Sequence, residues 1–552
     1  MNIWNRFVRT LFAFVIAASL CLSWAAAPAK AAPPKPKVTW SPCYQQFGLP
    51  FECGTVQVPL DYDDPGVGSI SIALIRLPAS DPSQRIGSLF FNPGGPGGSG
   101  VDFILFAAAV FPEEMRAHFD MVGFDPRGIA RSTALRCFGT PRQWGPIFTP
   151  FAFPTTPEEE AAWEAADRFL VGECEQRAGH IIDHMSTADV ARDLDLLRQA
   201  VGDEKLNYVG YSYGSYLGVT YANLFPNNFR ALVVDGVLDP IAWATGLPGQ
   251  EDLPFSTRLR SDAGAIATLQ EFFRLCDEGG PNCAFAPDSA SRFDALAEKI
   301  KAEPVLITFP DGSILYINYS FLIANALGAM YNSFSWQSFA EFLAFLEAEA
   351  SATTLAAKLQ AFWASQGFIT KRGFPNYPNF VEGFPGVACS DTDNPDTYAA
   401  WSQAAKDAES QFGYFGPLWT WITSICATWP GSQADRYAGP FTATTANPVL
   451  VTSTLFDPAT RYEGAVTVAG LLPNSRLLTV NGWGHTTPFL SQCADLAVLN
   501  YLLTGELPPE GTVCNQDWVP FTAPSTVTNT GAAGRARLLP ALVPDVLRPP
   551  AK

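Results

Sequence analysis

The sequence predicts an α/β protein with a mostly parallel, doubly wound sheet, because strand-like and helix-like segments alternate along it. Four short, mostly apolar runs have the character of buried parallel strands: residues 87–92, 119–124, 206–211 and 230–235. A loop or a helical pattern follows each of them, as in a doubly wound sheet. The clearest helical pattern covers residues 187–201, where Ser186 and Asp189 resemble a capping box.

Further segments indicate how the chain is divided. Extended runs at residues 55–62 and 69–77 are joined by a turn signal, Asp63-Asp64-Pro65-Gly66. The pattern breaks near Asp239-Pro240, and strand-like runs resume only at residues 448–456 and 475–481. We therefore expect one core interrupted by a large, mainly helical cap between its sixth and seventh strands, rather than two independent domains. The expected divisions are 1–31 for a signal peptide, 32–240 and 441–522 for the core, 241–440 for the cap, and 523–552 for a flexible tail.

The first 31 residues have the pattern of a secretory signal. Arg6 and Arg9 form a basic start, and residues 11–27 are apolar. Ala29-Lys30-Ala31 is a candidate cleavage site, with Ala25-Ala26-Ala27 as the alternative. An uncleaved membrane anchor is the alternative, although the apolar run is shorter than the ~20 residues that a membrane span prefers. We expect a secreted or cell-envelope protein with no integral membrane segment after cleavage.

The cysteines agree with export. Eleven cysteines less Cys21 leave an even number, as expected of disulfides in an oxidising compartment, and none forms a Cys-x-x-Cys pair. Connectivity does not follow from sequence, but pairing between neighbours along the chain is our expectation. The expected pairs are Cys43–Cys53, Cys137–Cys174, Cys276–Cys283, Cys389–Cys426 and Cys493–Cys514.

The net charge is −18, and it becomes −21 without the signal's Arg6, Arg9 and Lys30. Such a surface repels nucleic acid and anionic membranes, so no nucleic-acid partner is expected. His180 and His184 have the spacing of one helix face, but Asp183 is not a convincing further ligand. We expect these histidines to be solvated or structural, and we expect no metal and no cofactor.

The stretch Gly210-Tyr211-Ser212-Tyr213-Gly214 carries the clearest chemical signal in the sequence. It ends an apolar run, and glycines on both sides allow the backbone to turn sharply from strand to helix. Such a turn holds a serine in a strained, exposed position, as in the nucleophile elbow of serine hydrolases. We therefore predict that Ser212 is the nucleophile of an α/β-hydrolase fold.

A serine nucleophile needs a general base, and only His485 of the four histidines follows Ser212. The order along an α/β-hydrolase chain is nucleophile, acid and histidine. His485 lies in a glycine-flanked loop after the last predicted strand, and Asp457 follows the strand before it. We predict that Asp457 orients His485 and stabilises its charged form, with Asp239 as the alternative acid.

Acyl transfer also needs two preorganised N–H donors for the oxyanion. We expect Tyr213, directly after the nucleophile, to supply one donor and Gly95 to supply the other. Gly95 lies in a loop, residues 91–100, whose many glycines let the backbone approach a substrate closely. A phosphate-binding loop is the disfavoured alternative, because no Gly-Lys-Ser/Thr follows.

Four motifs together resemble those of secreted tripeptidyl aminopeptidases and their prolyl aminopeptidase relatives. They are Pro93-Gly94-Gly95-Pro96-Gly97, Gly123-Phe124-Asp125-Pro126-Arg127-Gly128, Gly210-Tyr211-Ser212-Tyr213-Gly214 and Gly484-His485. The resemblance extends over residues 40–520. Prolyl aminopeptidases usually have His where Pro93 stands, and this departure favours the tripeptidyl branch. The resemblance implies a serine aminopeptidase that releases short peptides or proline through an acyl-enzyme.

An exopeptidase of this kind must bind the ammonium group of its substrate, and an acid in the cap would do so. Asp391 and the nearby Glu382 are candidates, with ordinary surface acids as the alternative interpretation. Arg127 is expected to tie loops together rather than to touch substrate. The expected partner is a peptide with a free amino terminus, and the expected state is a monomer.

Two other functions stay open at this point. A secreted carboxylesterase or lipase would use the same scaffold, and an aromatic-rich cap is compatible with acyl chains. A non-catalytic binding protein of the same fold is disfavoured, because such proteins commonly lose a triad member whereas this sequence has Ser212, Asp457 and His485.

Overall fold

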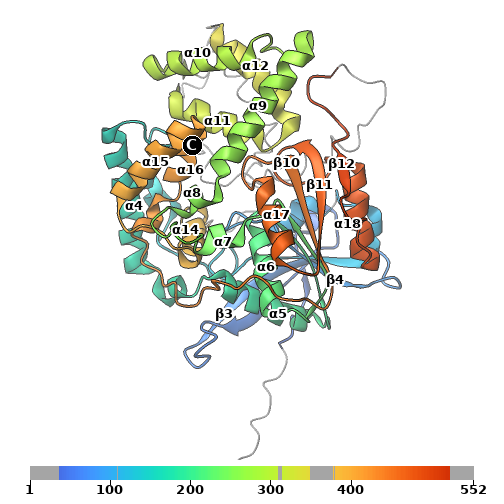
Figure 1. Cartoon of the computed structure of the whole chain (residues 1–552). Coiled ribbons are helices and arrows are strands. Elements are labelled where there is room, and N and C mark those ends of the chain that lie inside the picture. The colour runs from blue at the N-terminus through green and yellow to red at the C-terminus, as the bar shows by residue number, and fades with distance from the viewer. Residues whose placement is uncertain (1–35, 109, 309–313, 349–376, 378, 523–552) are drawn as a thin grey trace, which may run out of the picture. The chain divides into compact units, whose positions relative to one another are not determined.

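The computed structural model describes residues 36–108, 110–308, 314–348, 377 and 379–522 (Figure 1). The expected signal peptide and the expected C-terminal tail lie outside these residues. A ten-stranded sheet has the order β1-β2-β3-β5-β4-β6-β7-β10-β11-β12. The pairs from β1 to β5 along this order are antiparallel, and all pairs from β5 to β12 are parallel. The strands are β1 Ser41–Pro42, β2 Glu52–Pro59, β3 Ser69–Leu77, β4 Gly87–Asn92, β5 Phe119–Phe124, β6 Leu206–Tyr211, β7 Phe229–Asp235, β10 Val449–Phe456, β11 Ser475–Trp483 and β12 Val513–Asn515.

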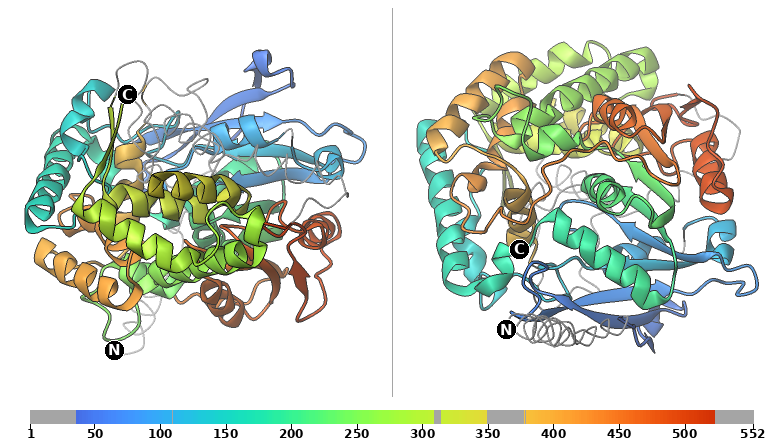
Figure 2. Two further views of the ribbon diagram at one scale, coloured as in Figure 1. Left: turned by 90° about the horizontal axis from the view of Figure 1, so that it is seen from above. Right: turned by 60° about the horizontal axis from the view of Figure 1, so that its bottom comes forward.

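Helices cover both faces of the sheet, which confirms the predicted doubly wound arrangement (Figure 2). Side chains alternate along β4, so that Phe90 packs on one face while Leu89 and Phe91 pack on the other. Because both faces are covered, every residue of β4, β5 and β6 is buried. One face is covered by α5 Thr187–Val201, α6 Tyr213–Leu224 and α17 Tyr462–Leu471, and the other by α2 Gly100–Ala107, α3 Glu113–His118 and α18 Gln492–Thr504.

The chain between β7 and β10 is mainly helical and supplies most of a second hydrophobic cluster, to which Phe153, Ala459, Trp483 and Phe521 also belong. The prediction did not include its small hairpin of β8 Val305–Thr308 and β9 Ile314–Ile317. The helices of this insertion are α7 Pro240–Ala244, α8 Phe255–Leu259, α9 Ser261–Gly279, α10 Ser289–Ala302, α11 Tyr319–Met330, α12 Trp336–Glu347, α14 Phe380–Asp391, α15 Tyr398–Phe412 and α16 Phe415–Trp421. Six short 3₁₀ helices complete the described elements: η1 Gln45–Phe47, η2 Pro141–Ile147, η3 Gly179–Asp183, η4 Gly280–Asn282, η5 Ser333–Ser335 and η6 Ser424–Ala427.

A helix from the expected N-terminal part of the core packs on the insertion. This is α4, Pro157–Arg177, between β5 and β6. The indole Nε1 of Trp163 donates to Ser424 Oγ of η6 at 3.0 Å. The sequence did not distinguish α4 from the helices that cover the sheet, because the hydrophobic residues that it contacts are far away along the chain.

All five expected disulfides are present: Cys43–Cys53, Cys137–Cys174, Cys276–Cys283, Cys389–Cys426 and Cys493–Cys514. Pairing between sequence neighbours is therefore confirmed. Within the part of the chain that the structure describes, no helix has both the length and the apolar character needed to cross a membrane.

Candidate active site

Ser212 occupies the sharp turn between β6 and α6, with φ 56° and ψ −126°. A non-glycine residue with positive φ is strained, and such strain gathers at functional sites. The flanking glycines are needed for space, because a Cβ atom at Gly210 would lie 2.1 Å from the Gly214 carbonyl oxygen. The Ser212 N–H donates to the Asp235 carbonyl at 2.9 Å, which fixes the turn to the end of β7.

Asp457 and His485 meet at the same edge of the sheet, because they follow the neighbouring parallel strands β10 and β11. His485 Nδ1 lies 2.9 Å from each carboxylate oxygen of Asp457. The Asp457 carboxylate is buried and also accepts hydrogen bonds from the backbone N–H groups of Ala459, Thr460 and Thr486. The carboxylate therefore fixes the orientation of the imidazole ring.

The other ring nitrogen of His485, Nε2, is buried and has no hydrogen-bond partner among the described residues. Gly236 lies against the ring, since a Cβ there would be 3.3 Å from His485 Cε1. Its neighbour Asp235 holds the Ser212 N–H. Ser212 thus contacts Asp235, the last residue of β7, and the His485 ring contacts the next residue, Gly236.

The glycine-rich loop packs directly on the elbow. A Cβ at Gly94 would lie 2.5 Å from the Tyr211 carbonyl oxygen and 2.9 Å from Ser212 Cβ, and Gly94 and Gly95 both have positive φ. Asn92 Oδ1 accepts the Gly94 N–H at 2.9 Å. The loop that contains Gly95 is therefore next to Ser212 and Tyr213. Tyr213 is the other expected oxyanion donor.

Sequence reasoning missed Asp235, the buried last residue of β7. Its carboxylate accepts the Thr487 N–H at 3.0 and 3.2 Å and the Thr487 hydroxyl at 2.6 Å, two residues beyond His485. Burial raises the pKa of Asp235 to about 7. The sequence feature that could have identified it is an acid at the end of an apolar strand.

Asp239, the alternative acid, instead caps α7 by accepting hydrogen bonds from the N–H groups of Ile241 and Ala242.

The insertion also contacts the histidine loop. The His485 N–H donates to the Tyr331 carbonyl at 2.9 Å, and the ring of Tyr331 meets the imidazole edge to face with centroids 5.1 Å apart. Asn332 forms a β-bridge with Gly484. The position of His485 therefore depends on the insertion as well as on the sheet.

Glu382 and Asp391 lie in α14 and are both buried. Glu382 Oε1 accepts the Tyr377 hydroxyl and the Cys137 N–H, whereas Oε2 has no partner among the described residues. Both oxygens of Asp391 accept hydrogen bonds from Thr187. Burial raises the pKa of each acid to about 7. Asp391 is thus already hydrogen-bonded to Thr187 of the core.

Arg127 ties segments together, as expected. Its guanidinium is buried and donates to both carboxylate oxygens of Asp193 at 2.7 and 2.8 Å. It also donates to the carbonyl oxygens of Pro59, Leu60 and His184. These bonds join the end of β2, the segment before α5 and α5 itself.

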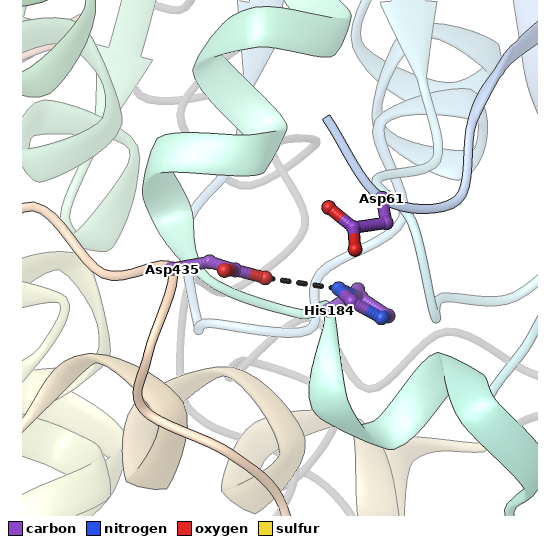
Figure 3. Close-up of side chains that lie close together, drawn as sticks. All are labelled: Asp61, His184 and Asp435. Atoms are coloured by element: carbon purple, nitrogen blue, oxygen red, sulfur yellow. Dashed lines mark hydrogen bonds and ion pairs between the residues drawn. The ribbon is translucent and has the colours of Figure 1, made fainter. Parts of the chain in front are cut away.

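Asp61, His184 and Asp435 lie close together, with donor atoms within 4.8 Å of one another (Figure 3). These residue types could coordinate a divalent cation. His184 Nδ1 and Asp435 Oδ2 are 2.9 Å apart, which is an ion pair when the histidine is protonated. The spacing of His180 and His184 indicated ligands on one helix face only, whereas Asp61 and Asp435 come from distant segments of the chain. The contact gives His184 a structural link to the loop after η6.

Residues 87–264 match the family described as alpha/beta hydrolase fold, and residues 410–514 match the family described as TAP-like protein. The serine protease Hip1 of Mycobacterium tuberculosis is 32% identical over 505 residues, which cover 86% of this chain and 91% of that protein. The tripeptidyl aminopeptidase of Streptomyces lividans is 30% identical over 497 residues, 86% of each chain. Carboxylesterase B of M. tuberculosis is 32% identical over 494 residues, 87% of this chain and 90% of that protein.

The sheet, the serine turn and these matches define an enzyme of the serine hydrolase class with the α/β-hydrolase fold. The resemblance seen in the sequence is confirmed. The chain belongs to the same family of α/β-hydrolases as the tripeptidyl aminopeptidase of S. lividans and Hip1.

Proposed function

We propose that this enzyme is a secreted serine exopeptidase that releases tripeptides or other short peptides, or proline, from free amino termini. The observation that carries the chemistry is the buried His485–Asp457 pair, whose ring lies against Gly236, the residue after the one that holds the Ser212 N–H. The similarity to a tripeptidyl aminopeptidase supports the choice of peptide substrates.

In the proposed reaction, Ser212 Oγ attacks the carbonyl carbon of the scissile amide while His485 Nε2 takes the hydroxyl proton. Asp457 stabilises the imidazolium, and the N–H groups of Gly95 and Tyr213 hold the oxyanion. Collapse of the intermediate expels the amine, which receives the proton from His485, and leaves an acyl-enzyme. Water, deprotonated by His485, then attacks the ester and regenerates Ser212.

We propose Glu382 as the partner of the substrate ammonium. Its Oε2 atom lacks a partner among the described residues, and its helix neighbours Gly383 and Phe384 pack against Gly97 of the glycine-rich loop. Asp391 is not carried into this role, because Thr187 occupies both of its oxygens.

Chromogenic amides of Ala-Ala-Pro and of Pro, each with a free or a blocked amino terminus, test the proposal. Wild-type enzyme should cleave the free amides, Ser212→Ala should not, and a fluorophosphonate should label Ser212. Glu382→Gln should raise KM for free amides and leave KM for a blocked ester unchanged. Correctly folded enzyme without amidase activity would contradict the exopeptidase proposal.

A carboxylesterase is the second candidate, favoured by the 32% identity to carboxylesterase B. Efficient turnover of blocked esters without aminopeptidase activity would select it. Export is proposed from the signal pattern at residues 1–31 and from the five disulfides. Amino-terminal sequencing of enzyme from the culture medium tests export, and a start near Ala32 is expected.

A further inference from the structure

We propose that α14 is a brace between the cap and the oxyanion hole, and that Asp391 is a positioning residue acting through Thr187 on Tyr213. The inference rests on the proposed use of Tyr213 and Gly95 as oxyanion donors. It concerns acyl transfer in general, so it holds for an ester as well as for a peptide substrate.

The C-terminal end of α14 reaches Tyr213 through two hydrogen bonds in series. Asp391, 1% exposed, accepts the Thr187 N–H at 2.8 Å and the Thr187 hydroxyl at 2.5 Å. The Thr187 oxygen is also hydrogen-bonded to the Tyr213 hydroxyl. When Asp391 is ionised, the single threonine proton is donated to it, so the tyrosine donates to the threonine. Both hydroxyl groups therefore point in one direction, toward the carboxylate.

This series of bonds fixes a residue whose backbone takes part in the proposed reaction. The Tyr213 side chain is buried and packs against Tyr216 and Trp243, with ring centroids 6.3 and 5.8 Å away. Its hydroxyl is held only if Thr187 is held. Because Tyr213 directly follows Ser212, a shift of its ring would be transmitted to the N–H group that faces the oxyanion.

The other end of α14 contacts the loop that contains Gly95. Asn379, directly before the helix, accepts the Ala130 N–H at 2.9 Å and donates to the Leu135 carbonyl at 3.1 Å. A Cβ at Gly97 would lie 3.1 Å from the Phe384 nitrogen, so the helix backbone lies against the glycine-rich loop. One helix thus contacts both segments that carry the proposed oxyanion donors.

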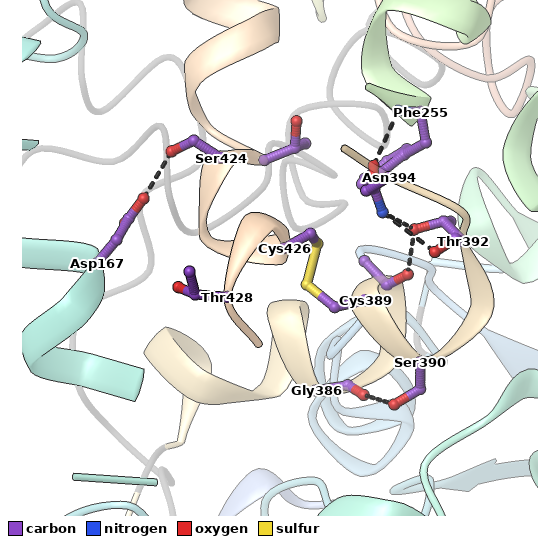
Figure 4. Close-up of a disulfide and its surroundings, with 12 residues drawn as sticks. Asp167, Phe255, Gly386, Cys389, Ser390, Thr392, Asn394, Ser424, Cys426 and Thr428 are labelled. Carbon is purple, nitrogen blue, oxygen red and sulfur yellow. Dashed lines mark hydrogen bonds between the residues drawn. A yellow bond between two sulfur atoms is a disulfide. The ribbon is translucent and has the colours of Figure 1, made fainter. Parts of the chain in front are cut away.

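The helix is itself fixed within the insertion. The Cys389–Cys426 disulfide joins its last turns to η6 (Figure 4). Gln433 Nε2 also donates to the carbonyl oxygens of Cys389 and Thr392, at 3.0 and 2.8 Å. A buried acid is costly unless hydrogen-bonded, so its place at the end of a fixed helix serves to hold Thr187.

Kinetics of four variants test the brace. Asp391→Asn removes the charge, Thr187→Val removes the hydroxyl, and Thr187→Ser restores it. Asp167→Asn is the matched control, because Asp167 of α4 is half-buried and its pKa is also raised by burial to about 7, but it binds Ser424 of η6 instead. The substrates are a free Ala-Ala-Pro amide and a blocked ester.

We expect Asp391→Asn and Thr187→Val to lower kcat on both substrates about 10- to 100-fold, the range that a small misplacement produces. KM should stay within about twofold, Thr187→Ser should recover most of the kcat, and Asp167→Asn should keep it. Fluorophosphonate labelling of Ser212 should slow in parallel.

Three results would overturn the brace. Unchanged kcat in Thr187→Val is one, and an equal kcat loss in Asp167→Asn, which would indicate general damage to the fold, is another. The third is a raised KM confined to the free amide, which would make Asp391 an ammonium ligand. If wild type cleaves only the ester, the exopeptidase proposal fails while the ester kinetics still decide the brace.

Discussion

Replacement of Asp235 by asparagine should raise the stability of the enzyme at pH 8 and lower its activity. The Asp235 carboxylate holds the Thr487 N–H and hydroxyl, and its backbone carbonyl holds the Ser212 N–H. It lies near the proposed base, so its negative charge supports the imidazolium that forms on His485 in the transition state. Asparagine has a similar shape but removes that charge.

The effect on stability can be worked out from the pKa of Asp235. Burial raises it from 3.8 to about 7, which corresponds to about 4 kcal/mol of preference for the neutral form. At pH 8 the native wild type bears this penalty, and asparagine, which resembles the neutral acid, does not. Its NH₂ group brings one further buried hydrogen, and leaving it unsatisfied costs about 1–3 kcal/mol. We therefore expect Asp235→Asn to be more stable than wild type at pH 8 by about 1–3 kcal/mol.

Activity should change in the opposite direction. We expect kcat at pH 8 to fall on the order of tenfold, because one charge near the imidazolium is lost. Below pH 7 the wild-type Asp235 is itself protonated, so the two enzymes should become similar in kcat. Urea unfolding at pH 8 and steady-state kinetics at pH 6 and 8 measure both quantities. A destabilised variant at pH 8, or a kcat ratio that does not change with pH, would refute this reasoning.

The other buried acids, the glycine-rich loop and the disulfides can be tested in the same way. Burial raises the pKa of Asp167, Glu382 and Asp391 to about 7. The native state therefore retains protons that the unfolded chain releases between about pH 4 and 7, and Tm should be higher at pH 5 than at pH 8. The reverse order in circular-dichroism melts would contradict this. Gly94→Ala should reduce kcat at least about 100-fold, because its Cβ would meet Tyr211 and Ser212. Gly202 has a similar positive φ but nothing within 4 Å, so Gly202→Ala should cost only about 1–2 kcal/mol of stability. Equal kcat values for the two variants would count against the packing argument. Removal of the Cys389–Cys426 disulfide, with a sequence separation of 37, should lower the free energy of unfolding by about 4 kcal/mol. Removal of Cys276–Cys283, with a separation of 7, should lower it by about 2 kcal/mol. The opposite ranking in urea unfolding would argue against loop entropy as the cause.

The sequence predicts the central strands well because they are buried on both faces. Near-continuous apolar runs identify β4, β5 and β6 at their observed bounds, and β7 begins one residue earlier than predicted. The short strands β1 and β12 at the two ends of the sheet have no such run, so their formation depends on the neighbouring strands. The β8 and β9 strands of the hairpin are apolar, but each is only four residues long.

The candidate site divides in the same way. Ser212, Asp457 and His485 lie in local motifs at strand ends, so chain order and parallel pairing suffice to bring them to one edge. Asp391 and Thr187 are 204 residues apart along the chain, and no local pattern relates them. An acid in the insertion was a reasonable candidate to bind a cationic ligand. The residue type alone, however, does not reveal which hydrogen-bond donor the fold places beside it.

Three buried carboxylates at this edge each hold a different part of the proposed machinery. Asp457 accepts hydrogen bonds from the histidine and its loop, Asp235 holds Thr487 and through its carbonyl the serine turn, and Asp391 holds Thr187. Burial disfavours the charged forms of Asp235 and Asp391, whose pKa values rise to about 7. A core selected for stability alone would place apolar side chains at these two positions. Directed hydrogen bonds fix the orientation of donors and rings, which apolar contacts do not, and an acyl-transfer site depends on that orientation. We therefore expect stabilising substitutions to be easiest to find at these two acids, and each should carry a loss of kcat.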